Sequence, residues 1–290
     1  MQPLFESALA RSLPVPTDDR DLVGLAMQET VMSRGKRLRP MLLLSAAAAL
    51  GVDPVTMHDA ACALELVHAA SLVLDDMPCM DNASLRRGRP TAHLQFGEDV
   101  ASLAVVALVS QAYRQIAASE ALSLSQRCQM LVVLADAVGH RGLVSGQLRD
   151  LRPVESGRDA TDAARVNQLK TGSLFRAAFD MAALAAGASA SARHQLQCCA
   201  DEIGQAFQLL DDMKDSGDVP SWGKSLHLDD GKRTLLSALG RDAARERMQR
   251  HLSVTEALLC DAFGDAGPVL QVLRRAMSTR SATATNASPD

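Results

Sequence analysis

The sequence contains few aromatic residues and little isoleucine. Aromatic residues make up 3% of the 290 residues, and isoleucine occurs only at positions 116 and 203. Aromatic and β-branched residues favour strands, whereas the alanine and leucine that fill most of the apolar class here are strong helix formers. The composition therefore argues against a β-rich fold and predicts an all-α protein.

The cysteines follow no pattern that would serve a metal or a disulfide framework. There are six, none forms a C-x-x-C pair, and Cys198 and Cys199 are adjacent. Structural zinc sites and disulfide-stapled domains need regular cysteine spacing, so neither is indicated. We expect reduced and mostly buried thiols.

The chain also lacks a strong excess of either charge. Its formal net charge is -4 and its pI is about 6.0, so no overall basic excess suggests nucleic acid or an anionic membrane as the main partner, and any basic chemistry must be local. No basic segment followed by an apolar one opens the chain, and the apolar runs are interrupted well short of the ~20 residues of a membrane-spanning helix. We therefore expect a cytoplasmic protein with no nucleic-acid partner and no integral membrane segment.

Apolar residues recur with helical spacing along most of the chain. We expect one domain over residues 1–290, with an ordered core at about 20–277 and a small, polar, disordered tail at 278–290. The predicted helices cover residues 53–76, 98–119, 123–152, 161–186, 189–213 and 241–263. No stretch predicts a sheet. The long loops 78–90 and 216–232 interrupt the pattern, and such loops are usually functional or disordered.

Two clusters of aspartates follow apolar helical runs. The first cluster is Asp75, Asp76 and Asp81, and the second is Asp211, Asp212 and Asp215. Asp211 and Asp215 lie at i and i+4 of a helix, so they face the same way. Asp75 and Asp81 are not aligned by a regular helix, but Pro78 should break the helix and allow Asp81 to return towards Asp75. Converging carboxylates are typical ligands of Mg²⁺.

One such cluster by itself is more often a helix cap or a solvated face. Two clusters with similar apolar approaches favour a different interpretation. If the two helices face each other across a bundle, they form a cage for several Mg²⁺ ions and a diphosphate at the mouth of an apolar cavity.

Basic residues accompany both clusters, and each of them taken alone could be a surface charge. They are Lys36, Arg37, Arg39, Arg86, Arg87, Lys170, Lys224 and Lys232. Beside acidic clusters they suit two diphosphate substrates, of which one is held through Mg²⁺ and the other directly by arginine and lysine.

Five short motifs occur in a fixed order between about residues 30 and 240. They are Gly35-Lys36-Arg37-Leu38-Arg39-Pro40; Asp75 to Asp81 followed by Leu85-Arg86-Arg87-Gly88; Gly146-Gln147 with Asp150; Lys170-Thr171-Gly172; and Phe207 to Asp215. In this order and spacing the sequence resembles the trans-isoprenyl diphosphate synthases. Within that family it most resembles the bacterial geranylgeranyl diphosphate synthases of the carotenoid-pathway type.

The resemblance implies an all-α, single-domain bundle around a central apolar cavity, and a homodimer. It also implies that Mg²⁺, as three ions when substrate is bound, is held against an allylic diphosphate by Asp75, Asp76, Asp81, Asp211, Asp212 and Asp215. The catalytic residues it implies are Asp75, Asp76, Asp81, Asp211, Asp212, Arg86 and Lys170.

The substrate contacts also come from the resemblance. The allylic diphosphate would meet Arg86, Lys170, Thr171, Gln208, Lys224 and Lys232. Isopentenyl diphosphate would bind Lys36, Arg39, His68 and Arg87. A lone histidine on an apolar helix is more often a core residue, so the role of His68 depends on the family match alone.

The implied reaction condenses isopentenyl diphosphate with C5 to C15 allylic diphosphates. The allylic C–O bond ionises, the second double bond attacks the carbocation, and a proton leaves. The floor beneath Asp75 would consist of Val67, Ala70 and Ser71, of which the two nearest are small. An open floor favours growth past C15 to the C20 product, geranylgeranyl diphosphate.

Several residues depart from the family pattern. Ala83 and Ser84 stand where many members have two further aspartates, and Lys214 lies inside the second motif, where we expect it to point away from the metal face. A farnesyl diphosphate synthase is the main alternative. A class I terpene cyclase needs no second diphosphate site, and a noncatalytic synthase subunit commonly lacks one acidic motif, so both are weaker alternatives.

Overall fold

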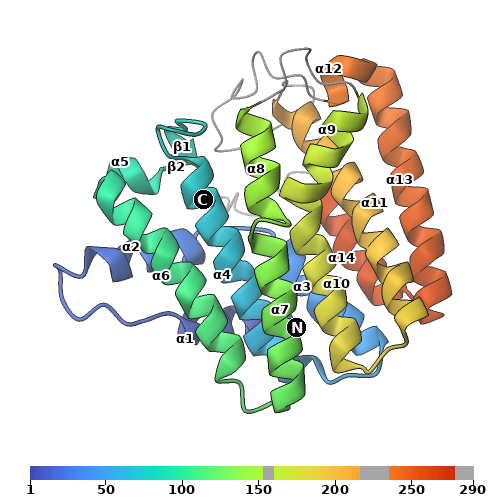
Figure 1. Cartoon of the computed structure of the whole chain (residues 1–290), viewed down its shortest axis with the longest axis horizontal. Helices are drawn as coiled ribbons and strands as arrows, with labels where there is room; N and C mark the ends of the chain where they lie inside the picture. Colours follow the sequence, from blue (N-terminus) through green and yellow to red (C-terminus); the bar gives the residue numbers. More distant parts are fainter. Residues whose placement is uncertain (153–159, 216–234, 278–290) are drawn as a thin grey trace, which may run out of the picture.

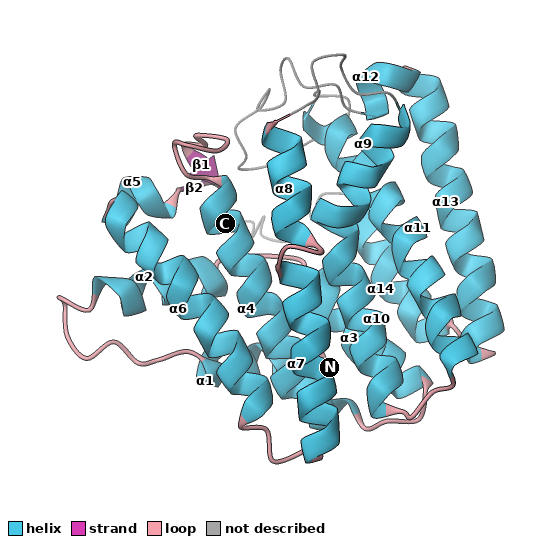
Figure 2. Cartoon of the chain, viewed as in Figure 1, coloured by secondary structure: helices cyan, strands magenta, loops and turns pink. Residues whose placement is uncertain are grey.

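The chain folds into a bundle of α-helices in this computed structural model, which describes residues 1–152, 160–215 and 235–277 (Figures 1 and 2). The helices of the first half are α1 (Gln2–Ser12), α2 (Leu22–Met32), α3 (Leu38–Ala49), the short η1 (Pro54–Met57), α4 (His58–Asp75), α5 (Ala92–Phe96) and α6 (Glu98–Ala117). Those of the second half are α7 (Leu124–Val138), α8 (Leu143–Leu151), α9 (Ala160–Asn167), the π-type turn η2 (Gln168–Gly172), α10 (Ser173–Ala185), α11 (Ala190–Asp215), α12 (Leu235–Leu239), α13 (Arg241–Phe263) and α14 (Gly267–Met277).

The prediction of an all-α fold is confirmed. Within the described ranges, strands occur only as one antiparallel hairpin, β1 (Leu85–Arg86) with β2 (Arg89–Pro90), in the loop after α4. Among the helix pairs, α4 packs extensively along α6 and α11 along α13, while α10 contacts α3, α7 and α11. In Figure 1, α4 and α11 both end at the upper side of the bundle, so both aspartate clusters lie at that side.

The described core begins earlier in the chain than the expected start near residue 20. Phe5 and Leu9 of α1 are fully buried, and α1 packs against α4. These two apolar residues lie at i and i+4, which gives α1 one face to bury. The tail at 278–290 lies outside the described residues.

One predicted helix is divided in two. The expected helix at 123–152 becomes α7 and α8, because the chain leaves the helical conformation at Gly139 and α8 starts after Gly142. Glycine is a poor helix former, and two within four residues end a helix readily. The expected helix at 161–186 is a nearly continuous run of α9, η2 and α10, with the π-type turn at Lys170-Thr171-Gly172.

The expectation of mostly buried thiols was wrong. Only Cys62 and Cys199 are buried, whereas Cys79, Cys128 and Cys260 are exposed; all six are free. The exposed ones lie in a loop or on outward helix faces, where a small side chain is tolerated without burial.

Two helices are longer and more apolar than we expected of this sequence. By length and composition alone, the segments Pro54–Asp75 and Glu98–Ala117 could cross a membrane. Most of the first segment is buried inside the bundle, where it forms the core helix α4. Only 33% of the second segment, α6, is buried, so much of its apolar surface is exposed.

Candidate active site

The first aspartate cluster is shaped by the turn that ends α4. The backbone N–H of Asp81 donates to the carbonyl of Asp75 at 3.0 Å, and that of Asn82 donates to the carbonyl of Met77 at 3.1 Å. The chain thus turns back after Pro78, as we predicted from the proline. Asp81 is thereby brought next to Asp75.

Asp75 is a partly buried carboxylate of this cluster. Burial raises its pKa to about 6, Asp81 adds to the rise, and the ammonium of Lys170 opposes it. Lys170 lies on η2, and its Nζ is 2.8 Å from Oδ2 of Asp150 on α8. Although burial works against its charge, Asp75 and Asp150 together raise the pKa of Lys170. Asp75 is therefore a largely desolvated acid with the ammonium of Lys170 nearby.

Asp76 faces a different partner from Asp75. It is only 3% exposed, and its carboxylate forms an ion pair with Arg86 of the hairpin. Nε of Arg86 lies 3.1 Å from both carboxylate oxygens. Burial raises the pKa of Asp76, while the bonds from Arg86 oppose that rise. The hairpin therefore brings a cation against the same carboxylate that the family match assigns to Mg²⁺.

The helix α8 approaches the π-type turn very closely. A Cβ atom at Gly146 would lie 2.4 Å from the backbone nitrogen of Lys170, so a larger residue would force the two segments apart. This contact explains the glycine of the Gly146-Gln147 motif. It fixes the distance between Asp150 and Lys170, and π-type turns are often found at functional sites.

A side-chain relay connects the π-type turn to the second aspartate cluster. Oγ1 of Thr171 donates to Oε1 of Gln208 at 2.8 Å, and Nε2 of Gln208 donates to Oδ1 of Asp212 at 2.9 Å. Two predicted contacts of the allylic substrate, Thr171 and Gln208, are thus joined to Asp212, a predicted Mg²⁺ ligand. Asp212 itself is 4% exposed.

The position of Lys214 differs from the expectation. Its Nζ lies 3.8 Å from Oδ1 of Asp211, three residues earlier on α11, so it does not point away from that carboxylate. A long, flexible side chain at this spacing can fold back towards an acid. The backbone of Asp215 completes α11, but its side chain, together with Lys224 and Lys232, lies outside the described residues.

Arg39 and His68 meet in the second predicted diphosphate subsite. Burial and the surrounding arginines lower the pKa of His68 well below its ordinary value, so the ring is neutral. Nη1 of Arg39 lies 3.2 Å from Nε2 of His68, and because a guanidinium can only donate, Nε2 accepts. His68 is thus a hydrogen-bond partner of a cation rather than a cation itself.

Two aromatic rings hold Arg39 from the other side. Its Cζ lies 4.7 Å from the ring centroid of Phe175 and 5.9 Å from that of Phe207, and the rings pack edge to face. Burial lowers the pKa of Arg39 to about 10, with Glu65 and Asp211 opposing from further away. Ring faces stabilise a desolvated guanidinium without neutralising it. The charge of Arg39 therefore remains available to an anion.

Arg87 and Lys36 complete this subsite. Nη1 of Arg87 donates to Oγ of Ser33 at 2.9 Å and lies over Gly35, where a Cβ would come within 2.8 Å of that nitrogen. Gly35 therefore provides the space for Arg87. Nζ of Lys36 donates to the carbonyl of Ala276 at the end of α14, at 2.5 Å.

The donor set of the aspartate clusters fits Mg²⁺. Carboxylate oxygens are hard ligands, and Asp75 and Asp81 repel each other without a cation between them. Among the side chains that the structure describes, no three acidic, histidine or cysteine groups already surround one point. Mg²⁺ would therefore have to draw the carboxylates together with the help of a diphosphate.

The departure at position 83 is compatible with this ligand set. Ala83 is 1% exposed, and its carbonyl accepts a hydrogen bond from Oγ1 of Thr91 at 2.8 Å. An aspartate side chain would have little room here.

A hollow of about 480 Å³, open to solvent, adjoins both subsites. It lies between α2, the end of α4, the hairpin and α5, and it reaches Asp76, Arg86 and Arg87. Val67 and Ala70 are both 2% exposed and belong to the main core, and Ser71 donates to the carbonyl of His68. Their role as a floor, and the apolar cavity that it would close, remain predictions.

Several residues that support the site were not predicted from the sequence: Glu6, Ser33, Glu65 and Phe175. Arg37 was predicted only as one of the cations beside the acidic clusters, with no particular contact. Arg37 lies inside one of the five motifs, and Glu65 lies one turn before His68. Their positions in the sequence could therefore have predicted a role in the site. Glu6 and Phe175 gave no comparable signal, because their contacts depend on how distant helices pack.

Comparison with known proteins identifies the family of the chain. The family model "Polyprenyl synthetase" matches residues 20–260, so the chain belongs to the polyprenyl synthetase family. The chain is 47% identical over 276 residues to a geranylgeranyl diphosphate synthase of Pseudescherichia vulneris, a match that covers 94% of this chain and 89% of the relative.

Solved structures of this fold cover nearly the whole chain. An apo FPP/GFPP synthase of Zymomonas mobilis has a TM-score of 0.85 and 33% identity, and the match covers 95% of each chain. A geranyltransferase of Helicobacter pylori, complexed with magnesium and isoprenyl diphosphate, has a TM-score of 0.83 and 28% identity, and covers 95% of this chain and 93% of its own.

Proposed function

We propose that this protein is a geranylgeranyl diphosphate synthase that condenses isopentenyl diphosphate with C5 to C15 allylic diphosphates. The observation that carries the proposal is the presence of two neighbouring groups of side chains with opposite charge. One contains buried carboxylates suited to Mg²⁺, and the other holds Arg39 by aromatic faces and a neutral histidine. A terpene cyclase has no use for the second subsite, and a noncatalytic subunit has no use for both aspartate clusters.

The ligands of Mg²⁺ would be Asp75, Asp76 and Asp81 with Asp211, Asp212 and Asp215, as three ions when substrate is bound. When bound, Mg²⁺ neutralises negative charge on the allylic diphosphate and assists its departure. The magnesium-bound Helicobacter geranyltransferase supports the use of this metal.

The other proposed site residues bind the two diphosphates and orient the reacting groups. Lys170 and Arg86 place positive charge where the diphosphate leaves, and they are already oriented by Asp150 and Asp76. Thr171 and Gln208 lie at the reacting end, with Gln208 oriented by Asp212. Arg39, Arg87 and Lys36 bind the second diphosphate, so its double bond is held towards the allylic carbon. Apolar walls exclude water from the cation.

The product length is the finer part of the proposal. Ala70 and Ser71 are small, and the relative from Pseudescherichia vulneris at 47% identity is a geranylgeranyl diphosphate synthase. Replacing Ala70 with Tyr should shorten the main product from C20 to C15 or less, because the ring would block the growing tail. Chromatography of the dephosphorylated products measures this. A C20 product from the Ala70→Tyr variant would place the floor elsewhere.

The first experiment is a product assay. The purified protein is incubated with isopentenyl diphosphate, Mg²⁺ and, separately, C5, C10 and C15 primers. A C20 alcohol after dephosphorylation supports the proposal. A C15 end point would make the protein a farnesyl diphosphate synthase, and no product from any primer would favour the cyclase or the noncatalytic subunit.

We also propose a homodimer in which α6 lies at the interface. Leu103 and Val106 lie one turn apart on α6 and are 57% and 63% exposed. Only 33% of the apolar segment that forms α6 is buried, and a contiguous exposed apolar surface marks an interaction site. Light scattering should report a dimer for the native protein and a monomer for the Val106→Glu variant; an unchanged mass would exclude α6.

A further inference from the structure

Arg37 differs from the two cations on either side of it. Lys36 and Arg39 donate to a backbone carbonyl and to a neutral histidine, respectively. Arg37, by contrast, is 5% exposed and paired with two carboxylates. Its Nη1 lies 2.7 Å from Oε1 of Glu65, and its Nε lies 3.0 Å from Oε1 of Glu6. Burial opposes the charge, but Glu65 and Glu6 together raise the pKa of Arg37. Arg37 is therefore neutralised and is not available to a substrate anion.

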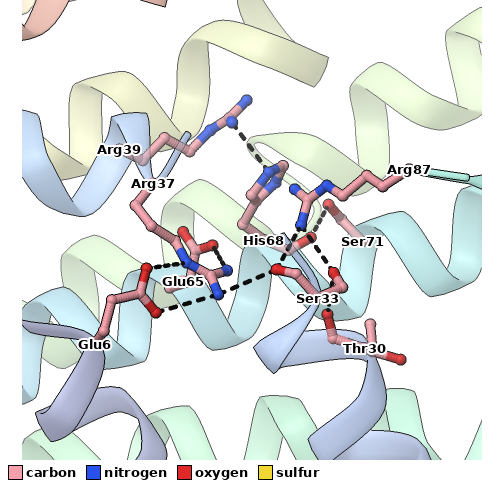
Figure 3. Close-up of polar contacts among 9 residues, drawn as sticks. All are labelled: Glu6, Thr30, Ser33, Arg37, Arg39, Glu65, His68, Ser71 and Arg87. Carbon is pink, nitrogen blue, oxygen red and sulfur yellow. Dashed lines mark hydrogen bonds and ion pairs between the residues drawn. The ribbon is translucent and has the colours of Figure 1, made fainter. Parts of the chain in front are cut away.

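The backbone of Arg37 is also unusual. Its φ is 47°, in the left-handed region that residues other than glycine rarely adopt, and it is the N-cap residue of α3. In Figure 3 the side chain of Arg37 extends towards Glu6 and Glu65, whereas that of Arg39 extends towards His68. A strained conformation persists only where the surroundings hold it in place. Here the two ion pairs hold it.

The hydrogen bonds of Arg37 lead towards both Arg87 and Arg39. These two arginines, with Lys36 and His68, form the proposed isopentenyl diphosphate subsite, which we call the cationic subsite. Nη2 of Arg37 donates to the carbonyl of Ser33 at 3.2 Å, and Oγ of the same serine accepts from Arg87 at 2.9 Å. The hydroxyl of Ser33 donates to the carbonyl of Thr30 at 2.8 Å, which leaves a lone pair directed at Arg87 (Figure 3). One arm thus runs from Arg37 through Ser33 to Arg87.

The second arm runs along α4. Glu65 precedes His68 by three residues, so both side chains lie on adjoining positions of one helical face. His68 is the acceptor for Arg39, as described above. The ion pair between Arg37 and Glu65 therefore fixes the start of α3, which carries Arg39, against the part of α4 that carries His68. Glu6 adds α1 to the same network.

We propose that Arg37 is a positioning residue for the isopentenyl diphosphate subsite, and that α1 contributes to substrate binding through Glu6. This inference depends on the proposed function, because it assumes that Arg39 and Arg87 bind isopentenyl diphosphate. Arg37 touches no substrate. It holds the cations that do.

The test uses mild variants of the full-length protein, because removing Arg37 would leave buried carboxylates unpaired. Glu6→Gln removes one charge partner of Arg37. Ser33→Ala removes the shorter of the two hydrogen bonds from Arg87 to Ser33 and leaves the one to the backbone carbonyl at 3.4 Å. The matched control is Glu202→Gln, because Glu202 pairs with His251 at a side-chain exposure of 30%, close to the 34% of Glu6. KM for isopentenyl diphosphate, KM for the C15 primer, kcat and Tm are measured for each.

We expect Glu6→Gln to raise KM for isopentenyl diphosphate about fivefold and Ser33→Ala about threefold, with KM for the primer unchanged. The control should change neither KM. Glu6→Asp should recover part of the loss because it restores the charge at a greater distance. An unchanged KM for isopentenyl diphosphate in both variants, or an equal rise in both KM values, would overturn the inference.

Arg39→Lys and Arg87→Lys separate this outcome from a failure of the proposed function. If these two variants raise KM for isopentenyl diphosphate while Glu6→Gln and Ser33→Ala do not, only the positioning role is wrong. If Arg39→Lys and Arg87→Lys have no effect on that KM, the subsite itself is misassigned and the positioning role falls with it.

Discussion

The two proposed diphosphate subsites at the upper side of the bundle differ in how their charges are arranged. Around α4 and the hairpin, carboxylates are already paired with cations, as Asp76 is with Arg86 and Asp150 with Lys170. Around α3, Arg39 is held by rings and a neutral histidine. The first arrangement needs added positive charge before it can hold a diphosphate, whereas the second already has it.

The pKa directions reflect the same difference. Burial opposes the charge of Arg86, but Asp76 and its neighbours raise its pKa; burial lowers the pKa of Arg39 to about 10. A cation that already has an acid partner is stabilised and partly neutralised. A buried cation with only polarisable neighbours gains most when an anion arrives. The two substrates should therefore respond differently to metal removal and to mutation.

The largest effect is expected from a variant of the proposed Mg²⁺ subsite. Asp75→Asn keeps the shape of the side chain but removes the negative charge of a proposed Mg²⁺ ligand, so we expect kcat to fall by about a thousandfold with KM for isopentenyl diphosphate nearly unchanged. Steady-state kinetics with each substrate varied in turn measures the split. A chelator should likewise abolish turnover while calorimetry still detects binding of isopentenyl diphosphate, and metal-dependent binding of that substrate would contradict the comparison.

A smaller effect is expected on the cationic side. Arg39→Lys keeps a charge but loses the planar group that contacts both rings and His68. KM for isopentenyl diphosphate should rise about thirtyfold, with KM for the allylic primer unchanged. The same kinetic design applies, and a rise confined to the primer would reverse the assignment of the two subsites.

The smallest effect is expected from a variant that tests whether the ring of Phe175 supports the charge of Arg39. Phe175→Leu keeps an apolar residue but removes the ring face nearest Arg39, so KM for isopentenyl diphosphate should rise about threefold. Phe179→Leu is the matched control, because Phe179 is also fully buried on α10, one turn further along. Both variants should lose similar thermal stability. Equal KM values in the two variants would mean that the ring contributes only packing.

Much of this arrangement is predictable from the sequence, because it depends on local spacing. The composition predicts the helices, and Pro78 predicts the turn that returns Asp81 to Asp75. The motifs indicate both subsites. What the sequence does not reveal depends on packing between distant segments: the pairing of Glu6 with Arg37, the contact of Phe175 with Arg39, and the fold-back of Lys214 towards Asp211.

The contact between Lys36 and the carbonyl of Ala276 has a consequence for how the protein is made. The two residues are separated by 240 positions in the sequence, and α14 packs against α3. Contacts between residues so far apart in the sequence carry a large loop-closure cost, so we expect this one to form late in folding. During synthesis α1 can pack against α4 early, but Lys36 gains this partner only after α14 has left the ribosome. We therefore expect a chain truncated before α14 to bind isopentenyl diphosphate more weakly than the full chain.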